Sequence, residues 1–209
     1  MKKLYLLVTA LVLALSSNGY AYEGDFSRDN TCYINVLGGA NFLQTEIEEG
    51  VRTDYRTGYI VSTSVGYEWC YGLRLEAEYA FRRNTIKDLH FFGRSFPADG
   101  RFQSSSYMGN LLWDLPLSYL GCDCWDIHPF IGGGIGYDFQ LIGGSIGGFD
   151  FREKSKHFSW QVMAGLAYPI FCNLDLMVEY TFHKGGLNHL YNHSIGAGLT
   201  YRFGAWEIW

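Results

Sequence analysis

Three features are scarce in this chain of 209 residues: proline, basic charge and long apolar runs. Only 4 residues are Pro, and 16 Lys and Arg are outnumbered by 21 Asp and Glu, so the formal net charge is −5. A net negative chain lacks the basic footprint of a nucleic-acid-binding protein, and we expect no nucleic acid among its partners. After residue 21 no apolar run approaches the ~20 residues that a membrane-spanning helix needs, so no helical span is expected.

The one apolar run stands at the N-terminus. Lys2 and Lys3 precede LYLLVTALVLAL, and the small residues Gly19 and Ala21 follow it. This order is typical of a secretory signal peptide, and the run is too short for a spanning helix. We therefore expect cleavage after Ala21, with residues 1–21 as signal peptide and residues 22–209 as one domain outside the cytoplasm.

Aromatic residues and glycine are abundant, at 18% and 26 residues. The stretch GLRLEAEYAFRR, residues 72–83, alternates apolar and polar side chains with a period of two. Leu75 and Tyr79 fall on one face, and Glu76 and Glu78 fall on the other. This period indicates a β-strand, whose apolar face points either into a soluble sandwich or out at lipid.

The same alternation recurs along the whole chain. It covers eight segments, at about 32–42, 57–69, 72–83, 105–117, 129–141, 158–170, 174–183 and 193–203. Each is near the ~10 residues that cross a bilayer as a tilted strand. Aromatic residues gather near the strand ends, as Tyr59 does opposite Tyr67 and Trp69, which indicates two interfacial girdles. The predicted fold class is all-β, an eight-stranded antiparallel up-and-down transmembrane β-barrel.

Short and long connections alternate between these segments. The short ones contain CYG, LGCDCWD and FCN, and the long ones cover residues 43–56, 84–104, 142–157 and 184–192. Outer-membrane barrels have short periplasmic turns and long outside loops. We therefore expect the long connections to lie outside the cell.

Several segments resemble a known family. GYIVSTSVGYEW, MGNLLWDL, HPFIGGGIGYDF and IGAGLTYRF look like strands of the small eight-stranded outer-membrane barrels of the OmpA-like, opacity-protein and bacterial surface-antigen group. The resemblance covers the mature chain. It implies the outer membrane of a Gram-negative bacterium, with membrane lipid and lipopolysaccharide as surroundings.

The end of the chain resembles an assembly signal. Gly198, Tyr201 and Phe203 match the C-terminal pattern that the barrel-assembly machinery recognises in this family. That pattern usually ends the chain, whereas GAWEIW follows here, so Trp209 is an alternative terminal aromatic residue.

The polar faces carry charges of both signs. We expect an interior charge network formed by Arg74, Glu76, Glu78, Arg82, Asp138, Glu179 and Arg202. An eight-stranded barrel has an interior just wide enough for side chains to fill, so a packed electrostatic core is favoured over a pore. The inward glycines Gly132, Gly134 and Gly136 leave a small water-filled cavity open as an alternative.

An enzyme that modifies lipid A is the rival class. Its candidates are His183, His189, His193 and Ser194. His193 and Ser194 are adjacent on one strand, so they point to opposite faces and cannot act together. His183 is expected to face inward near the rim, with no Ser partner that the sequence can place, and the histidines are interpreted as solvated residues of the rim. We expect no enzyme activity, no cofactor and no metal site, since the pair Cys122 and Cys124 alone is too little for zinc.

Segment 84–104 combines basic and aromatic residues. It holds Lys87, Arg94 and Arg101 together with four Phe. It either contacts lipopolysaccharide phosphates or a host surface, or folds over the barrel mouth. The function expected from these features is that of an outer-membrane surface protein with a structural, adhesive or antigenic role. A narrow porin-like channel is the alternative, and a lipid A-modifying enzyme is the third possibility.

All five cysteines fall at one end of the expected barrel. They are Cys32, Cys70, Cys122, Cys124 and Cys172. The periplasm favours disulfides, and an odd count leaves at least one thiol that cannot pair within the chain. The two alternatives are local staples or small turn residues, and cross-links to another copy or to other Cys-bearing envelope proteins.

Overall fold

A computed structural model describes residues 30–44, 46–48, 51–91, 94–115, 127–146, 149–185 and 191–203. The expected signal peptide, Cys122, Cys124, His189 and Trp209 lie outside these ranges. The elements are β1 (Thr31–Leu43), β2 (Glu46–Glu48), β3 (Val51–Tyr55), β4 (Gly58–Glu68), the short 3₁₀ turn η1 (Cys70–Gly72), β5 (Leu73–Phe91), β6 (Arg94–Asp114), β7 (His128–Ile146), β8 (Phe149–Phe171), β9 (Leu174–Lys184) and β10 (Tyr191–Arg202). Among the described residues, no helix is long and apolar enough to cross a membrane.

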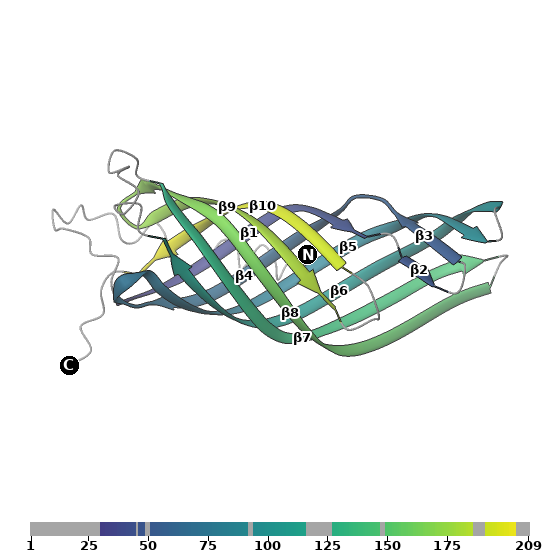
Figure 1. The fold of residues 1–209 in the computed structure, drawn as a ribbon, viewed down its shortest axis with the longest axis horizontal. Coiled ribbons are helices and arrows are strands. Elements are labelled where there is room, and N and C mark those ends of the chain that lie inside the picture. Colours follow the sequence, from purple (N-terminus) through teal and green to yellow (C-terminus); the bar gives the residue numbers. More distant parts are fainter. Residues whose placement is uncertain are drawn as a thin grey trace, which may run out of the picture.

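Eight of these strands form a closed ring. Each pairs antiparallel with its neighbours in the order β5–β4–β1–β10–β9–β8–β7–β6, and the pairing of β5 with β6 closes the ring (Figure 1). The β2–β3 hairpin continues the barrel wall past β4, because β3 pairs with the edge of β5 that β4 occupies, further along that strand. The expected eight-stranded antiparallel β-barrel is therefore confirmed.

The register shows how strongly the strands are staggered. A path directly across the strands starts at Glu68 on β4 and returns to β4 at Gly58, ten residues away. Its steps are Glu68, Arg74, Leu112, Gly132, Met163, Thr181, Ser194, Asn41 and Gly58. Such a stagger requires the strands to tilt against the barrel axis, so residues at one height are offset by slightly more than one position per strand.

Alternation along each strand separates the two surfaces of the barrel. On β9, Leu176, Val178 and Tyr180 are exposed, and Asp175, Met177 and Glu179 between them are buried. Outward side chains are largely apolar and inward ones largely polar, as expected for a barrel surrounded by lipid.

The β4–β5 turn reverses the chain over the three residues Cys70–Gly72. Tyr71 and Gly72 both have positive φ, at 70° and 73°, and Trp69 N donates to Leu73 O across the turn. Two successive left-handed residues match the twist of a tight hairpin, and glycine adopts this conformation without steric cost.

Three of the four predicted long loops contain paired strands: β2 pairs with β3 within residues 43–56, and two others are long hairpins. The segments 84–104 and 142–157 continue the strands, with Phe91 paired to Arg94 and Ile146 paired to Phe149. These hairpins extend past the ends of β1, β9 and β10 (Figure 1). The prediction of loops was wrong because the apolar–polar contrast that reveals strands depends on lipid contact. Beyond the membrane that contrast fades, although backbone pairing goes on.

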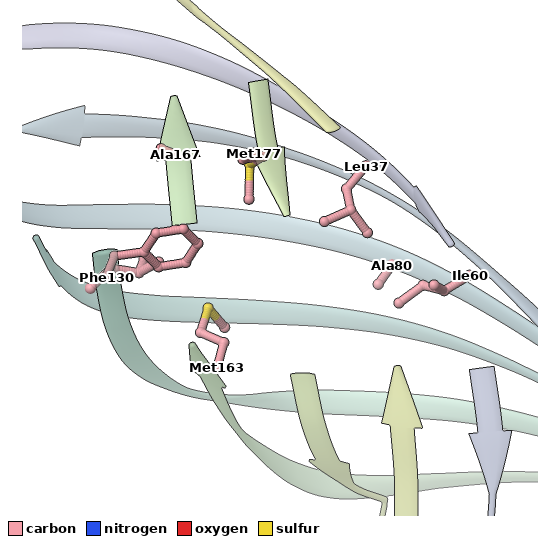
Figure 2. Packing of buried hydrophobic residues seen from close by; sticks show 8 residues of the cluster. Leu37, Ile60, Ala80, Phe130, Met163, Ala167 and Met177 are labelled. Carbon is pink, nitrogen blue, oxygen red and sulfur yellow. The ribbon is translucent and has the colours of Figure 1, made fainter. Parts of the chain in front are cut away.

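The barrel interior contains apolar residues as well as polar ones. Figure 2 shows inward side chains from several strands facing each other inside the ring. This cluster consists of Leu37, Ile60, Ala80, Leu112, Phe130, Met163, Ala167 and Met177. It lies among the charged residues described next.

Candidate functional site

The two ends of the barrel have different shapes. The end with the tight turns after β4 and β8 is called the turn end, and the end with the long hairpins β5–β6 and β7–β8 is called the hairpin end. The predicted charge network occupies the interior between them.

Arg202 forms an ion triad near the turn end. Its Nε lies 3.1 Å from Glu68 Oε2, and its Nη1 pairs with Asp175. These side chains come from β10, β4 and β9, and each is buried. Because β1 lies between β10 and β4, the triad connects four successive strands of the ring.

Arg74 forms a second charged group beside this triad. Its Nη2 lies 2.9 Å from Asp114, and its guanidinium carbon lies 4.8 Å from the ring centroid of Phe130. The Tyr33 hydroxyl donates to Glu76 at 2.6 Å. Gly66 makes room for this tyrosine, since a Cβ there would lie 2.3 Å from the Tyr33 ring.

Amide side chains hold the next carboxylate. Asn110 and Gln161 donate to Glu78 Oε2 at 2.8 and 2.6 Å, from β6 and β8 to β5. Thr181 donates to Glu179 at 2.8 Å. Contacts that reach across the ring in this way fill the interior with side chains.

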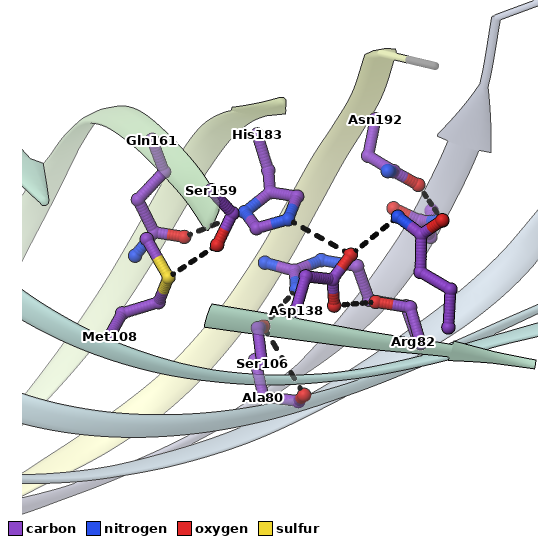
Figure 3. Close-up of polar contacts among 12 residues, drawn as sticks. Ala80, Arg82, Ser106, Met108, Asp138, Ser159, Gln161, His183 and Asn192 are labelled. Carbon is purple, nitrogen blue, oxygen red and sulfur yellow. Dashed lines mark hydrogen bonds and ion pairs between the residues drawn. The ribbon is translucent and has the colours of Figure 1, made fainter. Parts of the chain in front are cut away.

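Arg82 and Asp138 lie closer to the hairpin end. Arg82 Nη1 donates to Ser106 at 2.6 Å, and Asp138 accepts from Ser104 at 2.5 Å and from Gln140 at 2.8 Å. His183 Nε2 lies 3.6 Å from Asp138 Oδ2 (Figure 3). The structure thus brings all seven predicted charges into the interior, but in separate groups.

Neutral amides form a further layer that sequence reasoning missed. Asn41 donates to Asn84 at 2.6 Å and to Asn192 at 3.1 Å, and Ser194 donates to Asn41 at 2.7 Å. Next to this amide layer, toward the hairpin end, Leu43 and Phe102 form a small buried apolar cluster. Tyr55 and Ile142 pack against this cluster. The inward positions of these amides could be predicted from the alternation, but their mutual contacts require the register.

The inward glycines of β7 do not face open space. A Cβ on Gly134 would lie 1.9 Å from Asn110 Oδ1, and one on Gly132 would lie 2.8 Å from Leu112 Cγ. Neighbouring side chains on β6 take up the room that these glycines leave, so the glycines themselves indicate no cavity.

The predicted inward direction of His183 is confirmed, but the prediction that the histidines are solvated is wrong for this residue. His183 has 0% exposure, because it lies between Gln161 and Asp138. His193 lies on the outer surface, where its Nδ1 is 2.7 Å from the Tyr180 hydroxyl. Ser194 points inward from the next position, so the two adjacent residues lie on opposite faces.

The predicted assembly residues lie at the end of β10. Tyr201 and Phe203 are outward neighbours with ring centroids 5.2 Å apart. A Cβ on Gly198 would lie 2.5 Å from Val36 O, so this glycine permits close approach of β10 to β1. Phe203 N donates to Cys32 O at 2.9 Å and extends that pairing.

Three cysteines are placed at the turn end. Cys32 and Cys172 are free and exposed, and the backbone of Cys70 lies in η1. Since β10 and β9 separate β1 from the β8–β9 turn, at least two strand spacings of ~4.8 Å lie between Cys32 and Cys172. This separation exceeds the ~7 Å between Cα atoms that a disulfide permits.

Comparisons with known proteins agree with this geometry. Residues 7–203 match the family model described as outer membrane protein beta-barrel domain. An outer membrane protein of Gluconacetobacter diazotrophicus is 25% identical over 170 residues, which cover 71% of this chain and 45% of that protein. The chain therefore spans less than half the length of this relative.

Solved structures show the same fold. Neisserial surface protein A matches with a TM-score of 0.56 and 16% identity, covering 82% of this chain and 97% of that one. Ail, the attachment invasion locus protein of Yersinia pestis, crystallised with the heparin analogue sucrose octasulfate, gives 0.56 and 17%, covering 84% and 99%. OprG of Pseudomonas aeruginosa gives 0.55 and 13%, covering 86% and 99%.

Proposed function

The chain belongs to the outer membrane protein β-barrel family, and on that premise we propose that it acts at the cell surface, in an adhesive or antigenic role carried by its two long hairpins. The family places the protein in the outer membrane of a Gram-negative bacterium. Outer-membrane barrels keep their short turns in the periplasm, so the hairpin end faces outward.

The observation that carries this proposal is the length of β5 to β8. These four strands stay paired beyond the ends of β1, β9 and β10, up to Phe91–Arg94 and Ile146–Phe149. A connection that only joined two strands would need a few residues. A paired sheet that projects from the membrane instead offers a defined surface to a partner.

The interior supports a structural role for the barrel itself. Hydrogen bonds link β5 with β8 and with β1 across the ring, through Gln161–Glu78 and Asn41–Asn84. We infer that this interior is a stabilising core. A narrow channel is the alternative, and single-channel recording on refolded protein distinguishes them: steady conductance steps would favour the channel.

A lipid A-modifying activity has little support in the geometry. The buried His183 contacts Asp138 and Gln161. Its imidazole therefore lies in the barrel interior and does not reach the lipid outside. We propose that the protein is not an enzyme. Mass spectrometry of lipid A from cells with and without the protein checks this, and a modification that depends on the protein would contradict it.

The surface role is tested with shortened hairpins. Residues 87–99 are replaced by Asn-Gly, which joins the paired residues Ile86 and Gly100, and residues 143–152 are replaced likewise between Ile142 and Glu153. Tyr71→Asn in η1 is the matched control at the turn end. Cells expressing each variant are assayed for adherence to epithelial monolayers and for surface antibody binding, and gel heat-modifiability checks the fold.

We expect both shortened variants to fold and to lose adherence or antibody binding, with the Tyr71→Asn control unchanged. Shortened variants that match the wild type in both assays would contradict the proposal. So would wild-type expression that adds neither adherence nor antibody binding to bare cells.

A further inference from the structure

Charges on the barrel are separated by sign between its two surfaces. Among the described side chains in the strands, every carboxylate faces inward, and these are Glu68, Glu76, Glu78, Asp114, Asp138, Asp175 and Glu179. Five cations lie at outward positions: Arg83, Arg101, Lys154, Lys156 and Lys184. A chain with a net negative charge thus presents a purely basic outer surface over this part of its wall.

Each of these cations lies nearer the hairpin end than an outward aromatic residue of its own strand. Tyr79, Tyr107, Tyr137 and Phe158 pair directly across four strands and form an outward aromatic row. Such a row marks the membrane interface. Arg83 lies four residues beyond Tyr79 and Lys156 two residues beyond Phe158, both toward the hairpin end, which is headgroup depth in the outer leaflet.

The other rim of the barrel has a different composition. At the turn end the outward side chains include Trp69, Trp113, Tyr168 and Phe203. Within the described part of the chain, no charged side chain faces outward there. Both leaflets contain headgroups, but among the described side chains outward cations occur only toward the hairpin end, so we take their partner to be specific to the outer leaflet.

Aromatic rings hold two of the lysines in place. Lys156 Nζ lies 4.6 Å from the ring centroid of Tyr137 and 5.3 Å from that of Phe139. Lys184 Nζ lies 5.4 Å from the Tyr191 ring. Cations held over rings lose less side-chain freedom on binding than free ones.

The spacing of the cations suits a ligand with several anionic groups. Arg83 and Lys154 lie on one row, through Gln103 and Leu141, and three strand spacings of ~4.8 Å separate them. Lys156 lies two residues from that row toward the turn end, and Arg101 lies two residues from it toward the hairpin end. A molecule with two or more phosphates contacts several of these cations at once, with charge-assisted hydrogen bonds.

We propose that this basic wall, formed by Arg83, Arg101, Lys154, Lys156 and Lys184, binds the phosphate groups of lipopolysaccharide in the outer leaflet. This site is distinct from the hairpin tips that carry the proposed surface role. A phospholipid headgroup, with a single phosphate and present in both leaflets, accounts neither for the restriction of cations to one rim nor for their number.

The test uses full-length refolded protein in detergent and native mass spectrometry. The probes are diphosphoryl lipid A, monophosphoryl lipid A and phosphatidylglycerol. The test variant is Arg83→Gln with Lys154→Gln and Lys156→Gln. The matched controls are Gln103→Asn on the same row and the charge-preserving pair Lys154→Arg with Lys156→Arg. Heat-modifiability checks the fold of each variant.

The wild type is expected to bind diphosphoryl lipid A more tightly than either other lipid. Removing three cations is expected to weaken this binding roughly a hundred-fold, about five-fold per cation, with both controls unchanged. If the triple variant does not fold, Lys154→Gln alone is expected to weaken binding about five-fold. Unchanged affinity in the cation variants, or equal affinity of the wild type for phosphatidylglycerol, would overturn the proposal.

Discussion

Replacing Arg202 by Met should destabilise the barrel by several kcal/mol, because Arg202 is the cation of a buried ion triad. Arg202, Glu68 and Asp175 are 2%, 3% and 1% exposed, so water screens their charges poorly. At an effective dielectric constant of about 20, the pair Arg202–Glu68 at 3.1 Å contributes about 5 kcal/mol before desolvation. Removing the guanidinium leaves the buried carboxylates of Glu68 and Asp175 without their cationic partner. Breaking a buried ion pair in this way lowers the free energy of unfolding by about 3–5 kcal/mol.

The measurement is the free energy of unfolding in urea, followed by tryptophan fluorescence of protein refolded into lipid vesicles. The triple variant Arg202→Met, Glu68→Gln, Asp175→Asn should recover most of the loss, because it removes the uncompensated charges together with their partner. Arg83→Gln on the outer wall should change the free energy by less than about 0.5 kcal/mol. A loss below about 1 kcal/mol for Arg202→Met, or no recovery in the triple variant, would show that the triad is not a buried electrostatic unit.

Three further predictions address the lipid face, the topology and the thiols. Leu75→Arg puts a charge on the lipid-facing surface and should destabilise by about 2–4 kcal/mol near the bilayer midplane; a spin label at position 75 that is more accessible to a water-soluble relaxant than to oxygen would reverse this assignment. Trypsin added to whole cells should cut after Lys87, Arg94 or Arg101; protection there, together with chymotrypsin cleavage after Tyr71 in η1, would mean that the hairpin end faces the periplasm. Because Cys32 and Cys172 are exposed and too far apart to pair, non-reducing gels of thiol-blocked membranes should show reductant-sensitive oligomers; monomer alone, unchanged by reductant, would exclude cross-linking.

The alternation predicts the barrel well wherever lipid touches it. Glu76 and Glu78 face inward and Leu75 faces outward, because burying a carboxylate in lipid is far more costly than pairing it in the interior. The same pattern fails beyond Arg83, where both faces of the hairpins meet water or other protein. Strands pair there through backbone hydrogen bonds, and the side-chain pattern of the sequence does not reveal such pairing.

The interior groups could be predicted only in part. Charged residues are conspicuous in a sequence, and each of the seven predicted ones lies inside. The partners of these charges depend on register across the ring, which brings Asn41 to Asn84 and His183 to Asp138. No local signal contains that information, so the sequence predicts that His183 faces inward but neither its burial nor the contacts of the amide layer.

The closure of the ring has a consequence for how the barrel forms. Six neighbouring pairs, from β4–β5 to β9–β10, join strands that follow each other along the chain, and β1 meets β4 with only the β2–β3 hairpin inserted. The seam between β1 and β10, where Tyr33 faces Arg202, alone joins opposite ends of the described sequence. Its contact order is therefore the highest in the fold, and loop-closure entropy makes it the last pairing to form. A circular permutant opened at η1 would keep the interior contacts but move this final step to β4–β5.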